Sequence, residues 1–153
     1  MPEHVFTVVA RGRSVDAQDN NLTLFSILEQ VGSPSLPIRL PELTVATLWY
    51  RNHGEEGTEW VQRTRFLDPD GAELFHIETS FILEQKRQRV LAGFGNIPFE
   101  KAGVHRVEIS LRPSDASDWG EPKAVYPLDV AVYAPVDDAS LLPQESTETI
   151  PGP

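Results

Sequence analysis

The sequence contains no cysteine among its 153 residues and a single methionine. The absence of cysteine excludes disulfide bonds, thiolate metal sites and a cysteine nucleophile. No apolar run approaches the length of a membrane span, and the N-terminal residues lack the basic and apolar regions of a signal peptide. We therefore expect a soluble, cytoplasmic protein.

Basic residues are scarce, with 13 Lys and Arg against 23 Asp and Glu, which gives a formal net charge of −10. This acidic balance does not favour binding to nucleic acid or to an anionic membrane surface. With 40% hydrophobic and 24% charged residues, the composition is that of a globular chain. At this length about two-thirds of the surface can be buried, so one domain can form a core without covalent cross-links.

The last twenty residues, 134–153, differ from the rest of the chain. They hold four of the 13 prolines and four acidic residues but no basic one, and Leu141 and Leu142 form their only apolar pair. Such a segment buries too little apolar area to offset the entropy lost on ordering. The sequence predicts one domain over residues 1–133 and a flexible acidic tail over 134–153, with docking of the leucine pair on a partner as the alternative.

Turn-forming Gly, Pro, Asn and Asp recur at short spacing, and the runs between them are rich in β-branched and aromatic residues. Alternation of apolar and polar residues is typical of strands with one buried face. The sequence therefore predicts an all-β, antiparallel β-sandwich of seven to nine strands, with an immunoglobulin-like or related topology. Eight strands are expected near residues 4–11, 21–31, 42–51, 58–67, 72–83, 89–97, 104–112 and 123–133.

The alternation also predicts which side chains form the core. They are Phe75, Ile77, Phe81, Val107, Ile109, Leu128, Val130 and Val132. Residues 22–31 also fit a helical stripe, although a strand is favoured. Residues 84–89 are expected to form a polar hairpin connection, and Gly71 is expected to adopt a positive φ in the turn that follows Asp70.

Two segments resemble an uncharacterised bacterial family of single-domain β-sandwiches, a domain of unknown function. Asn21, Leu22, Leu24, Phe25 and Ile27 match its N-L-x-L-F-x-I/V pattern near the second strand. Phe99, Gly103 and Val107 match its F-x-x-x-G-x-Y-x-V pattern, with His105 in place of the tyrosine. The resemblance covers roughly residues 6–133 and implies a fold without an established activity.

Acidic residues in two loops are the candidate metal ligands. Asp16 and Asp19 in the first loop would meet Asp68 and Asp70 if both loops lay at one end of the sandwich, and clustered carboxylates suit calcium. The alternative is that these side chains cap their own turns. The histidines are scattered; His76 is expected to pair with Glu78, and His105 to be a partly buried structural residue.

The candidate binding residues are basic and aromatic. Lys86, Arg87 and Arg89 form a basic cluster in an otherwise acidic chain, and Trp119 lies in a loop of small polar residues, where we expect it to be exposed.

No catalytic motif is found, and no cofactor is expected. The favoured function is therefore a non-catalytic interaction domain whose partner is another protein or a second copy of the chain. The alternative is a module that binds calcium or carbohydrate through Asp16, Asp19, Asp68 and Trp119. A hydrolase is less favoured, because it would need a Ser, His and Asp set assembled by folding.

Overall fold

The computed structural model describes residues 1–133, and the predicted tail of residues 134–153 lies outside the described residues. The described chain contains no helix, so none of its elements is a helix that crosses a membrane. It contains nine strands, which confirms the all-β prediction. They are β1 (Glu3–Val15), β2 (Leu22–Ile27), β3 (Gln30–Ser33), β4 (Ile38–Tyr50), β5 (Glu59–Leu67), β6 (Glu73–Ile82), β7 (Arg87–Phe99), β8 (Gly103–Pro113) and β9 (Ala124–Val132).

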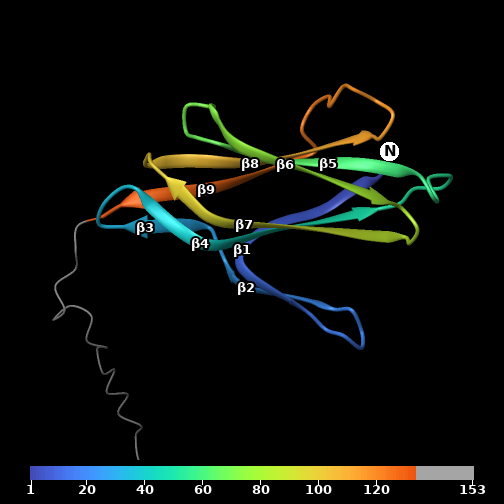
Figure 1. Cartoon of the computed structure of the whole chain (residues 1–153), viewed down its shortest axis with the longest axis horizontal. Coiled ribbons are helices and arrows are strands. Elements are labelled where there is room, and N and C mark those ends of the chain that lie inside the picture. Colours follow the sequence, from blue (N-terminus) through green and yellow to red (C-terminus); the bar gives the residue numbers. More distant parts are fainter. Residues whose placement is uncertain (134–153) are drawn as a thin grey trace, which may run out of the picture.

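The strands form two sheets packed face to face. Sheet A has four strands in the order β2-β1-β4-β7, and sheet B has five in the order β3-β9-β8-β5-β6. Figure 1 views the sandwich from the side, with most of sheet B above and sheet A below. The core lies between them, where alternate residues of facing strands, such as Val45 and Trp49 of β4 and Phe66 of β5, are buried.

A buried polar network joins the two sheets within this core. The indole Nε1 of Trp49 in sheet A donates a hydrogen bond of 2.7 Å to Oε1 of Gln62 in sheet B. The Gln62 Nε2 donates in turn to the hydroxyls of Thr64 at 3.1 Å and Thr47 at 3.5 Å. Each polar atom of the Gln62 amide therefore has a partner, as burial requires.

The predicted core is largely correct. Val107, Ile109, Leu128 and Val130 are buried, while Phe75 and Phe81 are partly buried against the core. Two of the eight residues remain exposed: Ile77 at 37% and Val132 at 46%. Ile77 lies on the edge strand β6, and Val132 is the last residue of β9, so neighbouring strands cover neither completely. Alternation identifies the inward face but not the edges.

The prediction of one continuous strand over residues 21–31 is wrong, because this segment forms two separate strands, β2 and β3. β2 belongs to sheet A and β3 to sheet B, and the chain crosses between the sheets at Leu28, which is buried. β3 then pairs with β9 in parallel, so sheet B is mixed, and the predicted antiparallel pairing holds for the other strand pairs of the described chain. The physical reason is that a chain crossing from one sheet to the other can join the new edge in either direction.

The predicted hairpin at residues 84–89 is likewise a connection between sheets. It leads from β6 in sheet B to β7 in sheet A. Local composition indicates a polar connection but does not distinguish a hairpin from a crossover. Gly71, in contrast, has φ of 87°, as the turn prediction requires.

Candidate functional site

The hairpin of β1 and β2 leaves the sandwich. β1 pairs with β4 from Glu3 to Ala10, and from Ala10 to Val15 it pairs with β2. The far half of β1 and the whole of β2 therefore form a two-stranded ribbon, which bends away from sheet A at the lower right of Figure 1. This bend leaves a hollow between the ribbon and the outer face of sheet A.

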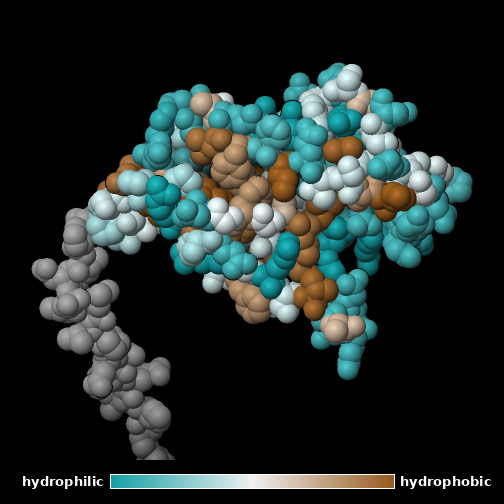
Figure 2. Space-filling view, viewed as in Figure 1, coloured by the Kyte–Doolittle hydropathy of each residue, from teal (hydrophilic) through white to brown (hydrophobic). Residues whose placement is uncertain are grey.

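The hollow is a groove of about 1060 Å³. Phe6, Leu48 and Arg89 lie side by side across β1, β4 and β7, because Phe6 pairs with Leu48 and Leu48 with Arg89. The remaining lining residues are Val15, Asn20, Asn21, Leu22, Leu24, Ile27, Gln85, Arg87, Gln88 and Leu91. Figure 2 shows apolar side chains (brown) gathered near the base of the ribbon and a hydrophilic tip (teal).

Arg89 joins the tip of the ribbon to the edge of sheet A. Its Nη2 donates to both the backbone oxygen and the side-chain Oδ1 of Asn20, each at 3.0 Å. Asn20 has a positive φ of 60°, which asparagine tolerates better than most residues. This contact spans 69 positions in the sequence and sets the distance between the two walls of the groove.

The basic cluster predicted from the sequence lies at one end of this groove. Lys86 and Arg87 are exposed, and with Asn20, Tyr50 and Gln85 they line a second hollow of about 730 Å³. Asn20, Gln85 and Arg87 line both hollows, so the two are continuous. Within residues 1–133, the Arg87 guanidinium has neither a hydrogen bond nor an ion pair, and no carboxylate lines either hollow. The combined groove is apolar in the middle and basic at one end.

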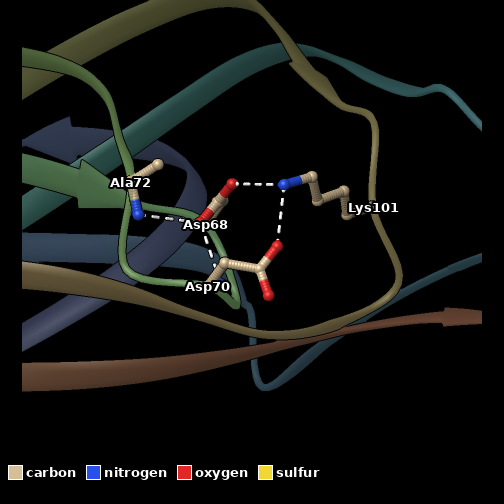
Figure 3. Close-up of polar contacts among 4 residues, drawn as sticks. All are labelled: Asp68, Asp70, Ala72 and Lys101. Carbon is tan, nitrogen blue, oxygen red and sulfur yellow. Dashed lines mark hydrogen bonds and ion pairs between the residues drawn. The ribbon is translucent and has the colours of Figure 1, made fainter.

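The candidate metal ligands Asp68 and Asp70 instead bind the ammonium group of Lys101. Lys101 Nζ lies 2.8 Å from one oxygen of each carboxylate, and both contacts are drawn in Figure 3. The other oxygen of Asp68 accepts the backbone N–H groups of Asp70 and Ala72, both at 2.9 Å. The hydrogen bond from Lys101 and the backbone donors lower the pKa of Asp68, while the two carboxylates raise the pKa of Lys101. This cluster ties the β5–β6 turn to the β7–β8 turn.

Asp16 and Asp19 lie at the ribbon tip, far from the β5–β6 turn in Figure 1. Asp16 Oδ1 accepts the backbone N–H groups of Gln18 and Asp19, which lower its pKa, and Asp19 accepts that of Asn21. The two acidic loops do not meet. Over residues 1–133 no three His, Asp or Glu side chains are grouped as a metal site would need.

Trp119 is half-buried, which corrects the prediction that it is exposed. The guanidinium carbons of Arg63 and Arg112 lie 4.5 and 4.6 Å from its ring centre. Arg112 also donates to the backbone oxygen of Ala116 and so fastens the loop that carries the indole. These contacts give Trp119 a structural role, because the two guanidinium groups over the ring cover part of it.

Two of the four histidines, His76 and His105, make local contacts that differ in kind. His76 pairs with Glu73 at 3.1 Å rather than with the predicted Glu78. His105 is buried, as expected; its ring meets Phe99 edge-on, and burial lowers its pKa.

The groove itself, whose two walls are the outer face of sheet A and the ribbon of β1 and β2, was not predicted from the sequence. The available signal was in β4, where Val45 and Trp49 lie on one face and Ala46 and Leu48 on the other, so that this strand is apolar on both faces. A strand of that kind in an otherwise alternating sandwich indicates that its outer face is also covered.

The fold and the groove define a two-sheet, all-β domain with a hollow outside its main core. The chain belongs to DUF6941, a family of unknown function, whose model matches residues 13–131. Membership in an uncharacterised domain family, expected from the sequence resemblance, is thereby confirmed. No curated protein matches the sequence.

Proposed function

We propose that this protein is a non-catalytic interaction domain whose groove binds a short, acidic segment of a partner protein through apolar and acidic side chains. The observation that carries the proposal is the guanidinium of Arg87, which has no partner among residues 1–133, beside the apolar side chains of Phe6, Leu48 and Leu91. Apolar side chains of the ligand would be removed from water on the floor, and a carboxylate would pair with the arginine.

The shape of the site favours an extended segment over a compact small molecule. The larger hollow alone, at about 1060 Å³, is slightly larger than the roughly 300–1,000 Å³ of small-molecule sites. The second hollow lengthens it toward Lys86. A peptide backbone with successive side chains fits a long groove of this kind.

The charge distribution favours an acidic ligand. The whole chain carries a formal charge of −10, yet basic residues and no carboxylates line this groove among residues 1–133. An acidic segment would be attracted to this groove and repelled by most of the remaining surface, so charge selects the docking position.

We also propose that the sandwich is of the immunoglobulin-like class. The chain runs from β4 to β5 and from β6 to β7 across the two sheets, and beside β3 the other four strands of sheet B have the order β9-β8-β5-β6. This corresponds to the G-F-C-C′ order of immunoglobulin sheets, with β4 and β7 in the places of strands B and E. The cytoplasmic location expected from the sequence stays a prediction.

Selection from a displayed library of random dodecapeptides tests the proposed function. The full chain is the target, and peptides that also bind the Arg87→Glu variant are removed. We expect enrichment of peptides that combine Asp or Glu with Leu, Ile or Phe. Enrichment of basic or uncharged sequences, or no enrichment, would contradict the proposal.

Arg106→Glu is the matched control. Arg106 is exposed on β8 of sheet B, and its replacement by Glu changes the net charge by the same amount as Arg87→Glu does. We expect the selected peptides to retain affinity for Arg106→Glu and to lose it with Arg87→Glu. An equal loss in both variants would show that net charge, rather than the groove, determines binding.

A further inference from the structure

The outer strand of sheet B is an open edge. β6 (Glu73–Ile82) pairs with β5 on one side and with no strand of the described chain on the other. Alternate residues of such a strand direct their backbone N–H and C=O groups outward. β6 has ten residues and contains no proline, glycine or lysine, the residues with which edges are commonly protected.

The other edges of the two sheets are shorter or interrupted. β3 has four residues and β2 has six. β7 is longer, but it contains Pro98, Gly93 and Gly95, which weaken strand addition. Among the described strands, β6 is therefore the edge best suited to pair with another chain.

Exposed apolar side chains accompany this edge. Ile77 faces the core layer yet is 37% exposed, because no strand of residues 1–133 lies beyond β6. Leu74 and Ile82 are exposed on the opposite face of the strand. A strand added beside β6 would cover part of Ile77 and extend the core layer by one strand.

We propose that β6 is the interface of a symmetric homodimer, in which the β6 strands of two copies pair antiparallel about Ile77. A two-fold axis makes such a contact self-complementary. The core faces of the two copies are continuous only if core-facing residues of one β6 lie opposite core-facing residues of the other. This requires the two-fold axis to pass through a residue of β6 rather than between two residues. Centring on Ile77 places Ile77 opposite its own copy and Phe75 opposite Thr79.

Charge selects this register over its neighbours. With Ile77 at the centre, His76 of each copy lies opposite Glu78 of the other. The imidazole can donate to that carboxylate in place of Glu73 or, when it is protonated, to both carboxylates. Centring on Glu78 would place two carboxylates directly opposite, and centring on His76 would place two imidazoles opposite. Glu78 forms no ion pair within residues 1–133, so it is available to a second copy.

The proposed dimer does not depend on the groove. β6 is the edge of sheet B, whereas the groove lies on the outer face of sheet A. Failure of one proposal therefore leaves the other standing.

Because the chain has no cysteine, single cysteines provide a direct test. In the proposed register, the two Ile77 positions are directly opposite, at about 4.5–5.5 Å between Cα atoms, within the range a disulfide spans. The two Ile82 positions are ten residues apart along the strand, or about 34 Å. We expect Ile77→Cys to form a covalent dimer at least about ten times faster than Ile82→Cys under mild oxidation, although Ile82 is the more exposed of the two, at 48% against 37%. Equal rates would overturn the proposal.

Sedimentation of the cysteine-free chain provides the second measurement. We expect a concentration-dependent dimer whose dissociation constant rises about tenfold or more in Glu78→Lys, which places lysine opposite His76. Glu121→Lys, with the same charge change in an exposed loop, is expected to dimerise like the unaltered chain. A monomer at about 0.2 mM, or equal weakening in both variants, would overturn the proposal.

Discussion

The hydrogen bond between Trp49 and Gln62 links the two sheets, and its removal has a calculable cost. Trp49→Phe deletes the indole N–H and leaves the buried Gln62 Oε1 without its 2.7 Å donor. An unsatisfied buried acceptor lowers the free energy of unfolding by about 1–3 kcal/mol. The variant also removes roughly 40 Å³ of side chain, which at about 24 cal/mol per Å³ adds about 1 kcal/mol. We expect the free energy of unfolding to fall by about 2–4 kcal/mol.

A double-mutant cycle separates the hydrogen bond from the packing. Gln62→Met nearly preserves volume but leaves the Trp49 N–H unpaired, while the double variant removes donor and acceptor together. We expect the double loss to be smaller than the sum of the single losses by about 1–2 kcal/mol, measured by urea unfolding with unchanged m-values. Additive losses, or a loss below about 0.5 kcal/mol in Trp49→Phe, would refute the argument.

Three further predictions concern the turns and the titratable groups. Gly71→Val places a β-branched residue at φ of 87°, and we expect a loss of about 1–2 kcal/mol in urea unfolding; full stability would contradict the turn assignment. Burial lowers the pKa of His105 and His4 below 6.5, so the unfolded chain binds more protons as the pH falls below that value. We therefore expect stability to decrease from about pH 6.5 downward, with a smaller decrease in His105→Gln; equal slopes would contradict this. Lys101→Met removes the cation beside Asp68, and carboxyl titration by NMR is expected to show a raised pKa for Asp68, whereas an unchanged pKa would exclude the ion pair.

The strands and the inward faces could be predicted because they depend on local properties. Turn residues mark the ends of the strands, and alternation identifies Val107, Ile109 and Leu128 as core. The split of residues 21–31 left only a weak signal: Leu24 and Leu28 are four positions apart and fit a period of two, whereas Val31 follows Leu28 by three and breaks it. The sheet to which each half belongs depends on contacts with distant strands, which alternation does not contain.

Only the part of the candidate site that depends on neighbouring residues in the sequence could be predicted. The cluster of Lys86, Arg87 and Arg89 is visible in the sequence because its members are adjacent. Its contact with Asn20 at the ribbon tip joins residues 69 positions apart and follows from the bend of the hairpin. Trp119 was misjudged because Arg63, which covers its ring, lies on a distant strand.

A charge-exchange experiment tests the central claim most directly, that the groove binds an acidic segment beside Arg87. Fluorescence anisotropy would measure the affinity of a selected acidic peptide, and of its counterpart with one Asp or Glu replaced by Lys, for the unaltered chain and for Arg87→Glu. We expect the acidic peptide with Arg87→Glu, and the Lys-containing peptide with the unaltered chain, to bind at least about tenfold more weakly than the original pair. The Lys-containing peptide with Arg87→Glu is expected to recover most of that loss. An acidic peptide that binds Arg87→Glu as tightly as the unaltered chain, or a doubly exchanged pair with no recovery, would contradict the claim.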